Sequence, residues 1–165
     1  MKQLTLIRHA KSSWDEIGLA DIDRPLNARG RRDAPEMGRR LKALGFVPDV
    51  VLVSSAKRTQ QTALALWIAL GIEPRSRIEP ALYMAGTTAM LELIEATSAA
   101  VSHLVLIGHN PGLTALAKRL GATSIENIPT AGMVRFHVDA ERWSALDFER
   151  IEWIDFDYPK RVRPR

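Results

Sequence analysis

The chain has 165 residues, of which 46% are hydrophobic and 25% charged, a size and balance that exclude a disordered chain and are typical of one globular domain. It contains no cysteine, which excludes disulfides, thiolate metal sites and a cysteine nucleophile. The formal net charge is +4, with basic clusters at 29–32 and 39–42 and a basic tail at about 159–165. We interpret these clusters as solvated surface. No aromatic side chains that could stack on the bases of a nucleic acid are interleaved with them.

Strands and helices are predicted to alternate along most of the chain. In chain order, the predicted elements are a strand at 4–7, a helix at 27–44, a strand at 50–53, a helix at 56–70, a short strand at 76–78, a helix at 88–97, a strand at 104–107, a helix at 111–120, and strands at 133–138 and 150–156. Continuous apolar strands that alternate with amphipathic helices indicate an α/β fold, a three-layer sandwich with a mostly parallel central sheet and helices on both faces. We expect the last two strands at an edge, with some antiparallel pairing.

Cationic or titratable side chains follow each of the three buried strands. Arg8 and His9 follow the first strand, Arg58 comes shortly after the second, and His109 follows the third. The carboxyl ends of parallel strands meet at one edge of a sheet, and ligands bind beyond that edge in open α/β folds. We therefore expect these four side chains to lie together.

The predicted helix starts strengthen this expectation. Ser55 is predicted to be the N-cap of the second helix, which places Arg58 in its first turn, where a cation faces the positive end of the helix dipole. Asn110 and Pro111 form a natural pair of N-cap and first helical residue, so His109 also lies at a helix start. Such a site favours an anion, and a phosphoryl group would be bound by guanidinium forks, imidazole and backbone N–H groups together.

The sequence also indicates how such a pocket could react. It contains no Gly-rich phosphate loop and no carboxylate cluster spaced for Mg²⁺, so we expect neither a metal nor another cofactor. Histidine can itself be a nucleophile. We expect His9 to attack phosphorus and carry it as phosphohistidine, while Arg8, Arg58 and His109 stabilise the charge on the equatorial oxygens.

Several separated motifs resemble the histidine phosphatase superfamily, which includes phosphoglycerate mutases and acid phosphatases. The motifs are LIRHA at 6–10, DRPLNARG at 23–30, PDVVLVSS at 48–55, Arg58 with QQTA at 60–63, and GHNPG at 108–112. The family signature is Arg-His-Gly, and the replacement of its Gly by Ala10 is common in the small bacterial SixA-like branch of phosphohistidine phosphatases. The resemblance spans nearly the whole chain and implies a phosphoglycerate mutase-like fold.

The resemblance also implies roles for individual residues. It makes His9 the nucleophile and Arg8, Arg58 and His109 the rest of the phosphate pocket. Arg24 is either a further substrate contact or a residue whose salt bridge holds a loop. Asn27 is predicted to be the N-cap of the first long helix, and His103 and His137 match no motif, so we assign both to structural roles.

One position departs from the family pattern. Many members supply a carboxylic acid at the position that we match to Met84, so this chain lacks that proton donor. Expelling an alkoxide from a phosphate ester needs such a donor, whereas expelling imidazole, whose pKa is about 6.5, needs much less help. The missing acid therefore favours phosphohistidine as the substrate.

The sequence predicts a metal-independent phosphohistidine phosphatase that acts on a phosphohistidine-bearing protein, such as a phosphorelay or phosphotransfer domain, and that binds phosphate or sulfate in its site. Two alternatives stay open: a phosphatase of small phosphate esters, with Glu79, Glu92, Asp15, Asp21 or Asp23 as the acid, and a non-catalytic phosphate-binding module. No signal peptide and no apolar run of the roughly 18 residues that a membrane helix needs are visible. We expect a single cytoplasmic domain over 1–165, with neither a membrane nor a nucleic-acid partner.

Overall fold

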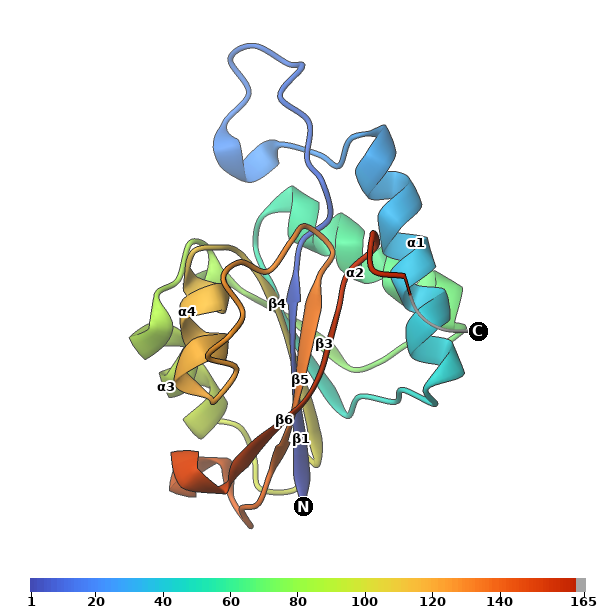
Figure 1. Cartoon of the computed structure of the whole chain (residues 1–165). Coiled ribbons are helices and arrows are strands. Elements are labelled where there is room, and N and C mark those ends of the chain that lie inside the picture. Colours follow the sequence, from blue (N-terminus) through green and yellow to red (C-terminus); the bar gives the residue numbers. More distant parts are fainter. Residues whose placement is uncertain (163–165) are drawn as a thin grey trace.

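Residues 1–162, the part of the chain that this computed structural model describes, form a mixed six-stranded sheet with helices on both faces (Figure 1). The strands are β1 (Lys2–Arg8), β2 (Val50–Ser54), β3 (Ser76–Glu79), β4 (His103–Gly108), β5 (Met133–Val138) and β6 (Ile151–Asp157). Their order across the sheet is β3-β2-β4-β1-β5-β6. The first four in this order pair in parallel, and β5 and β6 pair antiparallel at one edge. The predicted α/β sandwich is confirmed.

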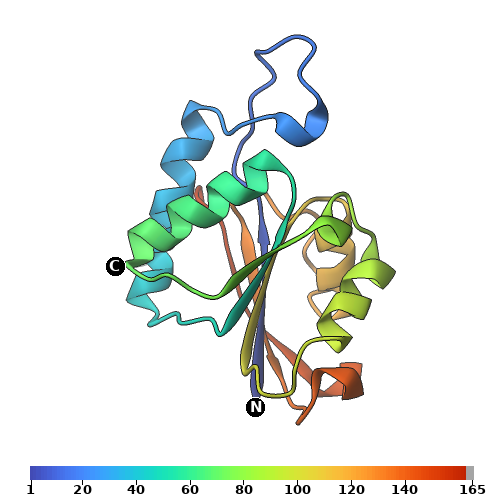
Figure 2. The ribbon, with the colours of Figure 1, turned by 180° about the vertical axis from the view of Figure 1, so that it is seen from behind.

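The helices form the two outer layers. They are α1 (Ala28–Ala43), α2 (Lys57–Leu70), α3 (Thr87–Glu95) and α4 (Gly112–Arg119), with short 3₁₀ turns η1 (Asp21–Asp23), η2 (Pro80–Leu82), η3 (Trp143–Ala145) and η4 (Phe148–Arg150). Helices α1 and α2 cover one face of the sheet, and α3 and α4 cover the other (Figure 1 and Figure 2). Within the described residues, none of these helices is both long and apolar enough to span a membrane.

The alternation of side chains along β4 shows why this strand is apolar throughout. All six of its residues are buried. Leu104 and Leu106 pack in the core under α3 and α4, whereas Val105 and Ile107 pack in the core under α1 and α2. Successive side chains of a strand point to opposite faces, so a strand covered on both sides needs apolar residues at every position.

The C-terminal segment is tied to α1 by Arg40. This side chain donates from Nη1 to Asp157 Oδ1 at 3.1 Å and to the Tyr158 carbonyl oxygen at 2.9 Å, and from Nη2 to the Pro159 carbonyl oxygen at 2.9 Å. Our interpretation of the 39–42 cluster as solvated surface was therefore wrong for Arg40, which holds residues 157–159 against α1. The predicted basic tail at about 159–165 lies partly outside the described residues, because positions 163–165 are not described.

Two predicted helix starts differ from the structure. The N-cap of α2 is Ala56 rather than Ser55, and its first turn is held instead by Thr59 Oγ1, which bonds the carbonyl oxygens of Ser54 and Ala56. Helix α4 begins at Gly112 with Pro111 as its N-cap, one residue later than predicted.

Asn110 and Asn27, which precede α4 and α1, both accept hydrogen bonds from the start of the helix that follows. Asn110 Oδ1 accepts hydrogen bonds from the Thr114 backbone N–H at 3.2 Å and from the Thr114 hydroxyl at 2.8 Å. Asn27 is the N-cap of α1, as predicted, and its side chain accepts from the Gly30 N–H at 2.9 Å.

Helix α1 touches the segment that follows the first strand. Gly30 lies so close to this segment that an added Cβ would be 2.2 Å from the Lys11 carbonyl oxygen. Lys11 also accepts a hydrogen bond from the Asn27 N–H at 3.0 Å. The start of α1 therefore packs directly against backbone that is two residues from His9.

We predict that Gly30→Ala lowers the free energy of unfolding by about 2–3 kcal/mol, because the new methyl group collides with backbone that cannot rotate away. The matched control is Gly86→Ala, since a Cβ at Gly86 would meet nothing within 4 Å and its φ is −86°. The control should cost about 1 kcal/mol or less, because alanine is a weaker N-cap than glycine. Equal losses in urea denaturation of the two variants would contradict the close contact.

His103 is a buried structural histidine, as assigned from the sequence. Its Nδ1 donates to the Val47 carbonyl oxygen at 3.2 Å, and its Nε2 is 2.9 Å from the Thr5 hydroxyl. Its ring meets the Phe46 ring edge to face with centroids 4.6 Å apart. Burial lowers the pKa of His103 to about 4, so the ring is neutral in the folded protein at pH 7.

The free energy of unfolding should consequently fall as the pH drops from about 6.5 towards 4, because the unfolded chain binds a proton at His103 in this range that the folded chain does not. The loss approaches about 1.4 kcal/mol per pH unit for each such histidine. Urea denaturation at pH 7, 6 and 5 measures this slope. His103→Gln should make the slope shallower; an unchanged slope in this variant would contradict the assignment.

Candidate functional site

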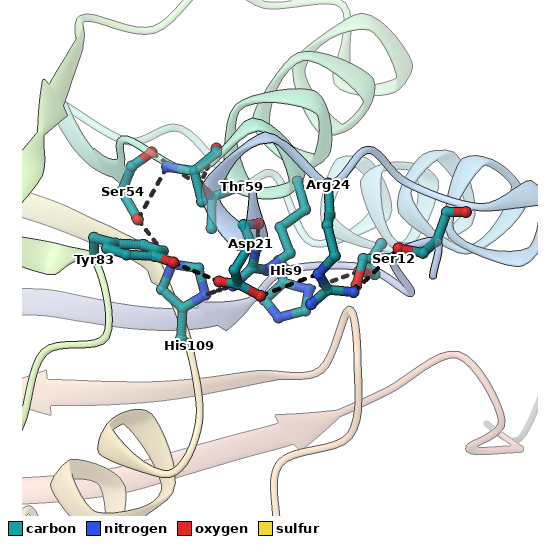
Figure 3. A network of polar contacts seen from close by, with 12 residues as sticks. His9, Ser12, Asp21, Arg24, Ser54, Thr59, Tyr83 and His109 are labelled. Carbon is teal, nitrogen blue, oxygen red and sulfur yellow. Dashed lines mark hydrogen bonds and ion pairs between the residues drawn. The ribbon is translucent and has the colours of Figure 1, made fainter. Parts of the chain in front are cut away.

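The carboxyl ends of β1, β2 and β4 lie side by side and place the predicted residues around one pocket (Figure 3). The His9 and His109 rings are 5.3 Å apart between centroids. The pocket has a volume of about 370 Å³. Its lining residues are Arg8, His9, Lys11, Ser12, Trp14, Asp21, Arg24, Arg58, Met84, His109, Asn110 and Thr130. The structure thus brings together all four residues that the strand ends pointed to, and Arg24 with them.

The hydrogen bond of His9 determines which of its ring nitrogens is available. Nδ1 is 2.7 Å from the Ala10 carbonyl oxygen, and a carbonyl can only accept, so Nδ1 carries the proton. Burial, together with the nearby His109, Arg58 and Arg8, lowers the pKa of His9 to about 3. The ring is therefore neutral at pH 7, and its Nε2 carries a free lone pair. This is the form of histidine that attacks an electrophile.

Two guanidinium groups, of the buried Arg58 and the partly buried Arg8, bring positive charge to the pocket. Arg8 donates from Nη1 to the Ile128 carbonyl oxygen at 2.9 Å, and Arg58 donates from Nη1 to the Asp21 carbonyl oxygen at 2.7 Å. The Nε atoms of both arginines are buried without a hydrogen-bond partner in the described structure. Burial lowers the pKa of Arg8, which reflects the cost of holding its charge away from water. A bound anion would offset that cost.

His109 lies between a hydroxyl group and a guanidinium. Its Nε2 is 2.7 Å from the Ser54 hydroxyl oxygen, and Arg58 Nη2 is 3.4 Å from its Nδ1. The Tyr83 ring meets it edge to face with centroids 5.6 Å apart. Burial and then the charge of Arg58 lower the pKa of His109 to about 4, although Asp21 opposes the shift.

Asp21 supplies the carboxylate of the pocket. Its side chain accepts hydrogen bonds from Arg24 Nε and from Arg58 Nη2, each at 3.0 Å, and from the Tyr83 hydroxyl. The hydrogen bond from Tyr83, followed by those from the two arginines, lowers the pKa of Asp21 to about 2. The carboxylate is therefore ionised at neutral pH and holds no proton to donate.

Arg24 connects the pocket to the loop above it. Besides Asp21, it bonds from Nη1 to the Ser12 hydroxyl at 2.9 Å and to the Ser13 carbonyl oxygen at 3.1 Å. The Trp14 ring covers its guanidinium at 3.5 Å from the ring centroid. These contacts hold the loop in place, while the position of Arg24 in the lining leaves a role as a substrate contact open as well.

The loop that carries Asp21 leaves and rejoins the fold at one place. Ser13 N–H donates to the Pro25 carbonyl oxygen at 2.8 Å, and Ser12 and Leu26 form an isolated antiparallel bridge. The residues between these contacts extend as a loop beyond the sheet (Figure 1). The loop is thus fastened at its base, directly beside His9.

Met84, matched above to the acid of other family members, is in the lining and is 55% exposed. Of the five carboxylates considered as substitutes, Asp21 lies in the pocket, whereas Asp15, Asp23, Glu79 and Glu92 are not among its lining residues. His137 lies on β5, where its Nδ1 is 3.8 Å from Glu152. His103 and His137 are likewise absent from the lining.

Sequence reasoning gave no role to Ser54, Tyr83 or Thr130, which contact or line the site. Ser54 is the last residue of β2, and its position at the end of a buried parallel strand could have predicted its place in the site. Tyr83 and Thr130 come from loops and carried no comparable signal. Within residues 1–162, no three His, Asp or Glu side chains are grouped so that they could hold a metal ion.

Comparisons with known proteins agree with this geometry. The family model of the histidine phosphatase superfamily (branch 1) matches residues 4–82. An uncharacterized protein of Mycobacterium tuberculosis is 33% identical over 164 residues, which cover 93% of this chain and all of that protein. An uncharacterized chloroplastic protein of Arabidopsis thaliana is 34% identical over 134 residues, covering 76% of this chain but only 62% of that longer protein.

Two solved structures share the fold over nearly the whole chain. A protein assigned as the phosphohistidine phosphatase SixA of Agrobacterium tumefaciens has a TM-score of 0.82 and 28% identity, and covers 96% of this chain and 99% of its own. The protein histidine phosphatase SixA complexed with tungstate has a TM-score of 0.80 and 20% identity, and covers 95% of this chain and 97% of its own. The chain therefore belongs to the histidine phosphatase superfamily, and its α/β fold is the phosphoglycerate mutase-like fold of the SixA structures.

Proposed function

We propose that this protein is a phosphatase that removes the phosphoryl group from phosphohistidine on other proteins, with His9 as its nucleophile. The observation that carries the proposal is the His9 ring, which donates from Nδ1 to the Ala10 carbonyl and directs the chemistry to Nε2 in a pocket lined by cations. The likeness to SixA structures supports phosphohistidine as the substrate class. Tungstate, which one of them holds, is an oxyanion of the kind that this pocket would take.

The reaction would proceed in two displacements. In the first, Nε2 of His9 forms a bond to phosphorus while the bond from phosphorus to the substrate imidazole breaks. The substrate ring, which carries a proton from solvent on its other nitrogen, keeps the electron pair of that bond and leaves as neutral imidazole. In the second, a water molecule attacks phosphorus, loses a proton to solvent, and the bond to His9 breaks, releasing inorganic phosphate and the neutral ring.

The surrounding charges would stabilise both displacements. The transferring phosphoryl group spreads negative charge over its equatorial oxygens. Arg8 and Arg58 line the pocket, and their guanidinium groups are fixed before the substrate arrives by hydrogen bonds to the Ile128 and Asp21 carbonyl oxygens. Preorganised donors in a site shielded from water stabilise developing charge more strongly than water does.

The leaving group decides between phosphohistidine and phosphate esters. Met84 has no proton to give, and Asp21, with its pKa near 2, is ionised in the free enzyme at neutral pH. An alkoxide would therefore have to leave without a protonated carboxyl group to assist it. Imidazole leaves far more easily, because its pKa of about 6.5 makes it a weak base.

We predict that His9→Ala abolishes turnover and leaves the fold intact, because His9 lines a pocket rather than filling the core. Rapid quenching of the wild-type enzyme with radiolabelled substrate should trap the label on His9 in an acid-labile, base-stable form. His137→Ala, which removes a histidine outside the pocket, should retain wild-type activity. Label on a serine, or a folded His9→Ala protein with most of the wild-type rate, would refute the mechanism.

The ratio of kcat/KM for a phosphohistidine peptide and a phosphoserine peptide of matched sequence tests the substrate class. We expect a ratio of at least about 10²–10⁴ in favour of phosphohistidine, since a proton donor contributes about this factor to the departure of an alkoxide. Comparable values would show that a donor exists elsewhere and would favour the phosphatase of small phosphate esters.

Met84→Glu tests the same point from the other side. A new carboxyl group at the pocket should raise phosphoserine hydrolysis more than phosphohistidine hydrolysis, provided that it reaches the leaving oxygen. Met84→Gln is the matched control, because it has the same shape but no acidic proton. A gain of similar size in both variants would mean that polarity, not proton donation, is responsible.

A further inference from the structure

The contacts of His109 determine where its proton lies in the free enzyme (Figure 3). Arg58 Nη2 can only donate a hydrogen bond, so the His109 Nδ1 that faces it at 3.4 Å must accept. The single proton of the neutral ring is then on Nε2, which donates to the Ser54 hydroxyl oxygen at 2.7 Å. His109 therefore has the opposite tautomer to His9, which carries its proton on Nδ1.

This tautomer conflicts with the anion that the pocket is proposed to bind. The nitrogen directed towards Arg58 and the pocket is Nδ1, and in the free enzyme Nδ1 presents a lone pair. A lone pair next to a phosphoryl oxygen is repulsive, whereas an N–H group there would donate a charge-assisted hydrogen bond. The conflict disappears if Nδ1 gains a proton when the anion enters.

We propose that an oxyanion binds together with one proton, which Nδ1 of His109 takes up from solvent. In this proposal Ser54 is the positioning residue: it accepts the hydrogen bond from Nε2 and so confines the uptake to Nδ1. The proposal rests on the proposed function only in using the same pocket. Protonated His109 would then donate from both nitrogens, to Ser54 on one side and to the anion on the other. The proton returns to solvent when the anion leaves.

The charged groups around His109 are arranged so that a bound anion can change the protonation state of the His109 ring. Arg58 on α2 and Arg8 on β1 oppose a positive charge on the ring, and Asp21 on η1 favours one. His9 lies 5.3 Å away between ring centroids, and Tyr83 presents only an uncharged ring to it. A dianion placed among these groups outweighs the opposition of the two arginines. Burial and these cations keep the pKa of His109 near 4 in the free enzyme, so the proton is absent until the anion arrives.

Ser54 is suited to this role by its burial and its backbone contacts. Its side chain is fully buried at the end of β2, and its oxygen also accepts from the Ala56 N–H at 3.3 Å. The hydroxyl oxygen is thus fixed opposite Nε2. Loss of the hydroxyl would leave the Nε2 proton without its acceptor, so that only Arg58 would still favour the proton on Nε2.

Sulfate is the appropriate probe, because it remains a dianion across the pH range and any proton taken up belongs to the protein. Titration calorimetry in two buffers of different ionisation enthalpy should show uptake of up to one proton per sulfate at pH 6. The dissociation constant should rise by up to tenfold per pH unit above pH 5. Nitrogen NMR of histidine-labelled wild-type protein should show the free His109 protonated on Nε2 alone and the complexed ring protonated on both nitrogens.

Ser54→Ala should bind sulfate about tenfold or more weakly, as expected for a lost hydrogen bond to an ionised group, and should take up less proton. Ser54→Thr keeps the hydroxyl and should restore both. Ser55→Ala makes the same change at the neighbouring position and should behave as wild type. Melting temperatures establish that the variants are folded, and the NMR experiment on the wild type tests the proposal even if a variant is not.

The outcomes separate the proposals. Sulfate binding that does not depend on pH, or a complex in which His109 stays neutral, would overturn the proton uptake while leaving the proposed function intact. Wild-type affinity, proton uptake and tautomer in Ser54→Ala would overturn the role of Ser54. A complete failure of the wild-type protein to bind sulfate would overturn the phosphate pocket, and the proposed function with it.

Discussion

The pocket depends on one constraint: three parallel strands end at the same edge of the sheet, in register with one another. Arg8 at the end of β1 is in register with Gly108 at the end of β4, and β2 ends beside β4 in the same direction. His9 and His109, which follow these strands, are therefore brought together although 100 residues of chain separate them. A slip of one residue would turn Leu104 and Val105 to the wrong faces of the sheet, so the two hydrophobic cores that hold the register also hold the geometry of the pocket.

The pocket gathers more positive charge than the protein alone compensates. Asp21 is the carboxylate in the lining, and it interacts with two arginines and Tyr83 at once. This network stabilises the pocket without a ligand, because Arg58 has an ionised partner. In the part of the chain that the structure describes, the Nε atoms of Arg8 and Arg58 still have no hydrogen-bond partner, and both histidines are neutral at pH 7. The free site is thus assembled in advance but electrostatically incomplete, which favours a dianion over a neutral ligand.

The sheet, its helices and the four residues that meet at the strand ends could be predicted from the sequence, because apolar strands and the rule for parallel strand ends are local signals. The N-caps Ser55 and Asn110 were predicted one residue early. Thr59 Oγ1 bonds the Ser54 and Ala56 carbonyl oxygens, and Asn110 Oδ1 accepts from Thr114 rather than from the second or third residue after it, as the cap rules assume. Tyr83 could not be assigned from the sequence, and Asp21 could not be distinguished from the four other carboxylates considered as the acid. Tyr83 and Asp21 come together from two loops that are 62 positions apart, and their contact depends on how both loops fold over Arg58.

The loop that carries Asp21 has a consequence for how this chain can diverge. Its base is closed by the bond between Ser13 and Pro25 and by the bridge between Ser12 and Leu26. When the base of a loop is closed, a change in the length of the loop does not move the strand that precedes it. Lengthening the loop also adds little to the entropic cost of closing it. The outer part of the loop around the exposed Ile17 can therefore change in length and sequence while β1, which ends just before His9, stays in place. The outer loop and the strand before His9 occupy adjacent stretches of chain and can change at separate rates.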